Sequence, residues 1–411
     1  MRFIKTFLLC VALLAATAAG SEAKKLRVAF VGDPQVDDLQ ELSYARKTIY
    51  KELRLRKDLD LVVILGDIVN DDVRLLAPSK ASLDSLPCPW VAVPGNHDRD
   101  MYTAKKGRQV NDIVDPDRSR DMATYTRIIG KPDTSLVMGG VKFIMMDDVR
   151  LVGKAAYEGG FREDQKKWLT EQLNATPKDM LAVLSVHIPF HEFKSRDSLQ
   201  TILSIHPKLL LMCGHTHSAA RFPVDLPDGG KVEEVLAGAT CGTFWRGKPG
   251  EDGVPHALMN CGAPRGYYVA DFDAKGRYTL DYKRVGATAS DKASVHVSED
   301  GSRVIVNVYG GATNGTVKVK LPGVKGNRTT SRKEMVAPEV EAIQAEQKAL
   351  PRKQRRLRNR DYIPLRSYKS PHIWTVRLED GDKPAAGKAT VLYDDGSMKF
   401  KVKRPVNLIG K

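Results

Sequence analysis

Short apolar segments that each stop at a polar cluster recur between Lys25 and about Gly286, and they constrain the fold more than any other feature. Helical periodicity appears between some of them, at 39–54 and 162–175. This alternation predicts an α/β domain with largely parallel strands covered by helices. The predicted strands are 26–33, 59–67, 90–98, 141–148, 180–189 and 208–217, followed by 233–240, 266–273 and 277–285 without strong helical patterns.

The pattern changes after Gly286, where short alternating strands are separated by Gly and Asp turns. This change predicts a small C-terminal β-sandwich over 287–411, with a basic helical insert near 331–360. The α/β domain then spans 24–286. With 42% hydrophobic residues, the chain is expected to fold rather than to remain disordered.

The first residues, 1–23, have the pattern of a secretory signal peptide. Arg2 and Lys5 precede an apolar run, and small residues around Ala18 and Ala23 suit cleavage. We therefore expect a periplasmic or secreted protein without a membrane span after cleavage, and an uncleaved anchor is the alternative. Four cysteines lie outside this leader, at 88, 213, 241 and 261, which are too few for a disulfide scaffold. Free buried thiols therefore fit the sequence at least as well as a disulfide bridge. If a bridge forms, Cys241 with Cys261 is the first pair to test.

The formal net charge is +15, and much of the excess lies in 328–369, which carries 12 basic and 5 acidic residues. Such a stretch either binds an anionic polymer or membrane surface, or is a solvated helix or linker. Its densest part, 351–360, contains no aromatic residue that could stack on bases, which favours the second interpretation. No specific recognition of nucleic acid is expected.

The polar clusters that follow the predicted strands share one chemistry. They contain carboxylates, carboxamides and imidazoles, which are donors preferred by Zn, Fe and Mn, and ligands gather at the carboxyl edge of parallel strands. Any one of these residues has an ordinary structural explanation, such as a helix-capping Asp or a buried His. Their joint occurrence in one order favours a metal site. The residues are Asp33, Gln35, Asp67, Asn96, His97, Asp98, His187, His215 and His217.

These clusters resemble the motifs of the calcineurin-like metallophosphoesterase family. The matching segments are DPQ at 33–35, GDIVN at 66–70, GNHD at 95–98, VHIP at 186–189 and GHTH at 214–217. The resemblance covers most of 25–220. It implies a four-layer αββα sandwich with a two-metal site at the strand ends, which hydrolyses a phosphomonoester or phosphodiester by attack of a metal-bound hydroxide.

The resemblance also implies a role for each residue. The first metal would be held by Asp33, Gln35, Asp67 and His217, and the second by Asp67, Asn96, His187 and His215. His97 would be a hydrogen-bond donor or general acid at the phosphate, oriented by Asp98. Gln35 departs from the commoner D-x-H form. The identity of the two divalent ions therefore stays open among Mn, Fe, Zn and Mg.

The segment 238–285 is similar to one in exported bacterial phosphoesterases of this type, and SPHIW at 370–374 resembles part of their C-terminal domain. Arg99, Trp245 and Arg246 are therefore candidate contacts for a phosphate-ester substrate. The alternative for Trp245 is packing against the sheet, and for Arg246 a place on the surface. We leave His191, His206 and His256 as structural or surface residues.

A competing interpretation is a non-catalytic surface module that binds an anionic glycan or polymer and keeps a structural metal site. His97 argues against it, because a structural site has no use for an imidazole that is not a ligand.

Overall fold

The computed structural model describes residues 25–100, 121–153, 156–194, 196–352 and 361–408. The predicted signal peptide and the most basic part of the insert, 353–360, lie outside these ranges. Within them, no helix is long and apolar enough to cross a membrane.

The first sheet follows the order β13-β12-β1-β2-β3, and its last three strands in this order are parallel to one another. The segments of β1 and β2 are rich in β-branched residues and are buried on both faces, as strands covered on each side must be. The strands are β1 (Leu26–Val31), β2 (Leu61–Leu65), β3 (Trp90–Val93), β12 (Gly266–Phe272) and β13 (Tyr278–Arg284).

The second sheet follows the order β10-β11-β9-β8-β5-β4, with β5, β8, β9 and β11 parallel. A separate hairpin, β6 (Val149–Gly153) and β7 (Ala156–Gly159), leads out of β5. The strands of the sheet are β4 (Thr134–Met138), β5 (Val141–Met145), β8 (Leu181–Ser185), β9 (Leu209–Cys213), β10 (Ala219–Asp225) and β11 (Lys231–Ala237).

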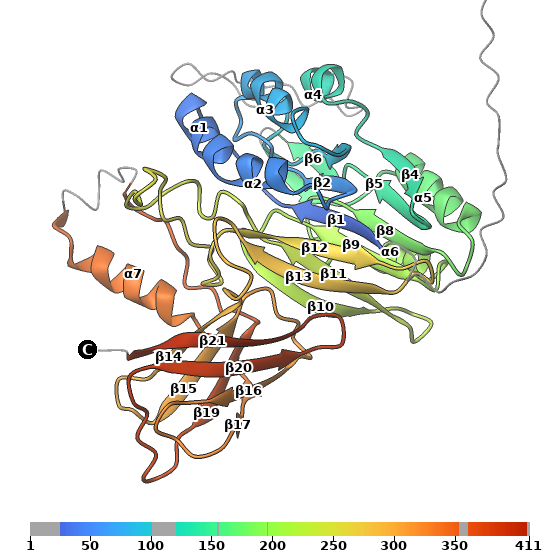
Figure 1. Ribbon diagram of the computed structural model, residues 1–411. Coiled ribbons are helices and arrows are strands. Elements are labelled where there is room, and N and C mark those ends of the chain that lie inside the picture. The colour runs from blue at the N-terminus through green and yellow to red at the C-terminus, as the bar shows by residue number, and fades with distance from the viewer. Residues whose placement is uncertain (1–24, 101–120, 154–155, 195, 353–360, 409–411) are drawn as a thin grey trace, which may run out of the picture.

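The two sheets pack face to face between two layers of helices (Figure 1). Phe272 of the first sheet contacts Phe143 of the second edge to face, with ring centroids 6.0 Å apart. The arrangement confirms the predicted αββα fold class. The outer layers are α1 (Leu39–Lys47), α2 (Ile49–Leu55), η1 (Val73–Leu75), α3 (Leu76–Leu83) and α4 (Ala123–Ile128) on the first sheet, with α5 (Glu163–Ala175) and α6 (Arg196–Leu203) on the second.

The predicted helix at 39–54 is divided in two at Thr48, which has a non-helical backbone. The Thr48 hydroxyl donates to the Tyr44 carbonyl at 2.7 Å and so satisfies one of the last carbonyls of α1. Side-chain hydrogen bonds of this kind compete with the backbone hydrogen bonds of the helix. The spacing of apolar residues in the sequence does not reveal this local effect.

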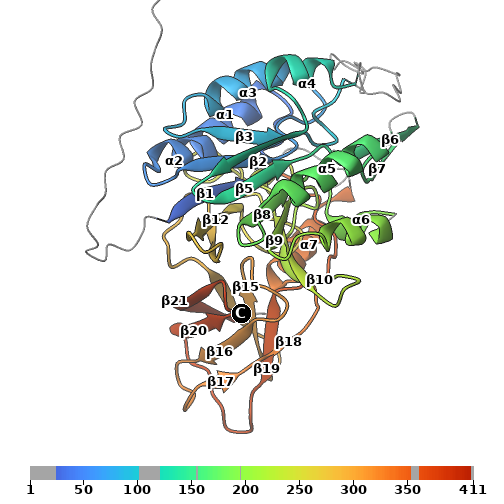
Figure 2. The ribbon, with the colours of Figure 1, turned by 90° about the vertical axis from the view of Figure 1, so that its right-hand side faces the viewer.

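The C-terminal strands form an eight-stranded sheet that folds over on itself below the two sheets (Figures 1 and 2). Its two halves share β21, which pairs with β20 along one part and with β14 along another. Trp374 and Tyr393 meet between the halves with ring centroids 5.6 Å apart, so the predicted sandwich packing is present. The strands are β14 (Ala293–Val297), β15 (Arg303–Val308), β16 (Thr316–Lys320), β17 (Arg328–Thr329), β18 (Ser331–Arg332), β19 (Ile373–Arg377), β20 (Lys388–Asp394) and β21 (Lys399–Leu408).

The insert contains one helix, α7 (Pro338–Ala349), which packs through Val340 on Ile305 and Ile373 of the C-terminal sheet. The helix itself is acidic in its first turn, with Glu339 and Glu341, and the basic residues follow it in the sequence. The description of the insert as a basic helix is therefore inaccurate for its helical part.

The cysteines at 88, 213, 241 and 261 are all free thiols, and the last three are buried. The suggested bridge between Cys241 and Cys261 is not formed. Burial of the Cys261 thiol raises its pKa to about 11, which makes it unreactive at neutral pH.

Candidate metal centre

The loops at the carboxyl ends of β1, β2, β3, β8 and β9 meet at one place, and their backbones are strained. Eight non-glycine residues in the described chain have positive φ, a conformation that costs each about 1–3 kcal/mol and that persists at functional sites. Most of them belong to the predicted metal-binding motifs or to the loop that packs beneath them. They are Asp33, Gln35, Asp67, Asp71, His215, His217, Phe244 and Trp245.

His187 is the centre of one half of the site. Its Nδ1 lies 2.8 Å from the Leu65 carbonyl oxygen and can only donate to it, so the lone pair is on Nε2 when the ring is neutral. That Nε2 faces Asn96 Oδ1 at 3.1 Å, Asp67 Oδ2 at 3.4 Å and His215 Nδ1 at 3.2 Å. Acceptor atoms that point at one another repel unless a proton or a metal cation lies between them, and this donor set fits a divalent metal.

The other half of the site lies on the opposite side of Asp67, and its predicted ligand atoms are farther apart. His217 donates from Nδ1 to the Gly242 carbonyl at 2.7 Å, which directs its Nε2 toward Asp33 Oδ1, 4.0 Å away. Asp33 accepts the His215 amide at 3.1 Å. These residues surround the space expected for a first metal. The tightest group lies in the half around His187: among the described residues, Asp67, His187 and His215 each have a ligand atom within 4.8 Å of the other two.

Gln35 faces Asp67 through its amide nitrogen, with Nε2 3.2 Å from Oδ2. Its Oε1 faces the Cys241 thiol at 3.8 Å. Gln35 thus lies where a ligand was predicted, but its oxygen coordinates a cation only after the amide turns over.

The glycines of the motifs allow this close approach. A Cβ on Gly95 would lie 2.0 Å from Asp67 Oδ1, and one on Gly66 would lie 2.3 Å from His187 Nδ1. Gly66 also has φ +85°, which favours glycine. Larger residues at these positions would push two predicted ligands out of place.

The charges of the site favour a cation. Burial alone would lower the pKa of His187, but Asp67 and Asp33 raise it to about 10. Burial lowers the pKa of His215 to about 3 and that of His217 to about 4, so these imidazoles stay neutral and can act as ligands. His215 and His217 thus offer neutral lone pairs beside the buried carboxylates, and a bound metal would take the place of the proton on His187.

His97 is held by a residue other than the one predicted. Its Nδ1 contacts Asp71 Oδ1. The Asp98 carboxylate is buried and accepts the backbone amides of Val69 at 3.0 Å and Gly95 at 2.9 Å. The prediction that Asp98 orients His97 is wrong in this structure: Asp98 fixes the shape of the loops, and Asp71, which the motif comparison did not single out, orients the imidazole.

The structure also corrects two of the predicted substrate contacts. Arg99 is 0% exposed, with its guanidinium against Asp121 and Asp147, and Trp245 is 0% exposed, with Nε1 donating to the Pro34 carbonyl at 2.9 Å. Neither side chain reaches the cleft. Arg246 is half-buried and is absent from the described residues that line the cleft, so its role stays a prediction.

A cleft of about 410 Å³ opens over the metal-binding residues. Several of its lining residues were not predicted from the sequence, because no motif marks them. Phe244 had one signal, since it directly precedes the candidate Trp245, and its ring lies 4.8 Å from that of His217. The missed residues are Tyr157, His191, Glu192, Thr216, Thr243, Phe244, Asn260, Pro364, Arg366 and Tyr368. His191, which was left as a structural or surface residue, lines the cleft and pairs through Nδ1 with the buried Glu234 at 3.1 Å.

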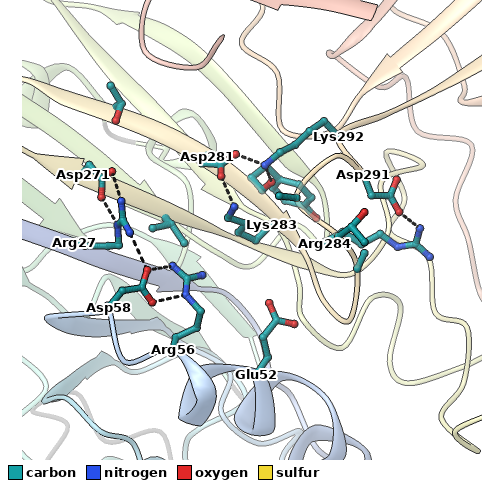
Figure 3. A pocket seen from close by; sticks show the side chains of 16 residues that line it. Arg27, Glu52, Arg56, Asp58, Asp271, Asp281, Lys283, Arg284, Asp291 and Lys292 are labelled. Atoms are coloured by element: carbon teal, nitrogen blue, oxygen red, sulfur yellow. Dashed lines mark hydrogen bonds and ion pairs between the residues drawn. The ribbon is translucent and has the colours of Figure 1, made fainter. Parts of the chain in front are cut away.

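A second cavity, of about 580 Å³, lies away from the metal-binding residues, beside α2 and β13. Figure 3 shows that its acidic and basic side chains pair with one another. Asp271 and Asp58 hold Arg27, for example, and Asp281 faces Lys283 and Lys292. Since these charges are already balanced, a charged ligand would have to displace existing ion pairs.

Comparison with known proteins agrees with this geometry. Residues 26–219 match the family model described as calcineurin-like phosphoesterase, and residues 234–395 match the model of its C-terminal region. No curated protein matches the chain. A solved structure titled "GAP50 the anchor in the inner membrane complex of Plasmodium" is similar at a TM-score of 0.38 and 15% identity, covering 63% of this chain and 84% of that one. From the two matched segments, we conclude that the chain belongs to the calcineurin-like phosphoesterase family.

Proposed function

We propose that this protein is an exported hydrolase of phosphate esters that uses two divalent cations. The family generally consists of phosphoester hydrolases, and the leader-like sequence at 1–23 supports export. The observation that carries the proposal is the convergence of carboxylate, carboxamide and imidazole ligand atoms around His187 Nε2, a donor set that suits a divalent cation.

Two sets of residues would hold the two cations, with Asp67 in both sets. When bound, the cations would lower the pKa of a water molecule and offset the charge of the phosphate. Oxygen donors predominate on the first side, which favours Mn, Mg or Fe there. The first set is Asp33, Gln35, Asp67 and His217, and the second is Asp67, Asn96, His187 and His215.

His97 is suited to assist the leaving group. Its backbone amide donates to Asp67 Oδ1 at 2.9 Å, and its ring reaches the cleft. Burial alone would lower the pKa of this imidazole, but Asp67 and Asp71 raise it to about 9. A protonated ring at this place can donate a hydrogen bond or a proton to the departing oxygen.

The test is hydrolysis of nitrophenyl phosphate and bis-nitrophenyl phosphate by the purified protein. We expect activity with Mn²⁺, loss of activity with a chelator, and recovery when the metal is restored. The two reporters also decide between monoester and diester chemistry.

Two variants separate catalysis from metal binding. His97→Ala should lose about 10²- to 10⁴-fold in rate while the metal content measured by mass spectrometry is unchanged, whereas His187→Ala should lose metal. A wild-type protein that holds metal and hydrolyses neither reporter would support the binding-module interpretation instead.

A further inference from the structure

The C-terminal domain contributes one wall of the cleft above the metal-binding residues. Pro364, Arg366 and Tyr368 line this cleft together with Gln35 and His217 of the α/β domain. These residues are far apart in sequence, and the segment that brings them there follows α7 and leads into β19.

This segment is attached on both sides. The Arg366 backbone amide donates to Asn260 Oδ1 at 3.0 Å, and the Asn260 amide donates to the carbonyl of His217 at 3.1 Å. On the other side, Gln344 of α7 donates to the Leu365 carbonyl at 3.1 Å. The backbone at Arg366 is therefore fixed relative to a predicted metal ligand.

Arg366 is the one lysine or arginine among the described residues that line the cleft. Its guanidinium has no hydrogen bond or ion pair within the described chain, and its side chain is exposed. Apart from His97, the charged residues that share the lining, Asp67 and Glu192, are acidic. A guanidinium presents a rigid fork of donors that suits carboxylate and phosphate oxygens.

The position of Arg366 separates it from the reacting phosphate. Asp67 is 1% exposed and lies at the floor of the cleft, whereas Arg366 lies at its exposed rim. A phosphate bound at the floor leaves the rim for another part of the same molecule. The aromatic rings of Tyr157, Phe244 and Tyr368 also face this space, which has the size of a small-molecule site.

We propose that Arg366 binds a second anionic group of the substrate, a carboxylate or another phosphate, so that the protein prefers small phosphate esters with two separate charges. This inference rests on the proposed function for the location of the first phosphate. Arg366 would determine specificity and would take no part in bond cleavage.

The test compares two esters that differ by one charge, phenyl phosphate and carboxyphenyl phosphate. Their binding to the Mn²⁺-loaded full chain is measured by calorimetry in the His97→Ala background, which should leave the esters intact. We expect tighter binding of carboxyphenyl phosphate, and a loss of about 10- to 100-fold of that preference in Arg366→Ala, as expected for a charge-assisted hydrogen bond. Arg366→Lys should retain part of it.

Lys369→Ala is the matched control, because Lys369 is an exposed cation three positions further along that does not line the cleft. It should leave the preference intact. Equal weakening of both esters in Arg366→Ala, or no preference before the substitution, would overturn the inference. If the wild-type protein hydrolyses neither these two monoesters nor bis-nitrophenyl phosphate, the proposed function fails, but the binding preference still decides the role of Arg366.

Discussion

His97 contacts Asp71 through Nδ1, while the carboxylate of Asp98, the next residue in the chain, accepts two backbone amides and serves the loops. Asp71 reaches the imidazole because its backbone has φ +69°, and its own amide donates to the His97 carbonyl at 3.2 Å. The loops that follow β2 and β3 are thus joined by two contacts between Asp71 and His97. Asp71 is therefore a positioning residue for the proposed general acid.

Asp71→Asn tests this role because it keeps the shape of the side chain and removes its charge. We expect kcat for nitrophenyl phosphate to fall about 10- to 100-fold, the usual effect of losing an outer partner of a site residue. KM and metal content should change little. Kinetics and metal analysis of the purified variant provide the measurement.

Asp98→Asn is the natural comparison. It replaces a buried acceptor of two amides, so it should lower the melting temperature, and Asp71→Asn should not. If instead Asp98→Asn keeps full stability and loses more kcat than Asp71→Asn, then Asp98 orients the imidazole and our assignment is wrong.

Gly95→Ala should remove metal binding. The new methyl group would lie 2.0 Å from Asp67 Oδ1, so the carboxylate predicted to bridge the two cations would have to move. We expect a much lower metal content after dialysis, measured by mass spectrometry, and a matching loss of activity. Gly230→Ala, where the nearest atom would be the Asp228 side chain at 3.0 Å, should retain its metal. Normal metal content in Gly95→Ala would show that Asp67 can move without cost.

The sequence was a good guide to where the candidate ligands lie, because each one follows a buried strand directly. Strand direction and pairing then decide where Asp33 or His187 must lie, and both are visible as apolar runs. Metal-binding motifs also repeat the same glycines, which the structure explains by close contacts at Gly66 and Gly95.

The substrate side of the cleft could not be predicted in the same way. Arg99 follows GNHD directly, but a neighbour in sequence lies on either side of the backbone, and this one is turned into the core. Phe244 and Trp245 show the same ambiguity, since one lines the cleft and the other is buried. Arg366 comes from a segment beyond α7, and no local pattern links it to the metal ligands.

Arg99→Ala should destabilise the protein without affecting substrate recognition. The substitution removes the guanidinium from two fully buried carboxylates, Asp121 and Asp147, and breaking a buried ion pair costs about 3–5 kcal/mol. Urea unfolding measures this free energy. Lys231→Ala, which removes an exposed pair with Asp225, should cost less than about 1 kcal/mol. An Arg99→Ala protein of normal stability but with a raised KM would restore the phosphate-contact prediction.

His372 should make the stability of the protein depend on pH. It is 0% exposed in the C-terminal domain and donates from Nδ1 to Asn307 Oδ1 at 2.7 Å, and burial lowers its pKa from 6.5 to about 4. Between these pH values the unfolded chain binds a proton that the folded chain does not. The free energy of unfolding therefore falls as the pH falls from about 6.5 to about 4, by up to about 3 kcal/mol from this residue.

His372→Asn keeps a donor toward Asn307 and removes the titrating ring. Its absolute stability will be lower because the ring leaves space in the core, so the informative quantity is the slope of the unfolding free energy with pH. Urea unfolding at several pH values between 7.5 and 4.5 should give a flatter slope for the variant than for the wild type. Carboxylates contribute equally to both slopes, and identical slopes would mean that His372 is protonated in the folded protein as readily as in the unfolded chain.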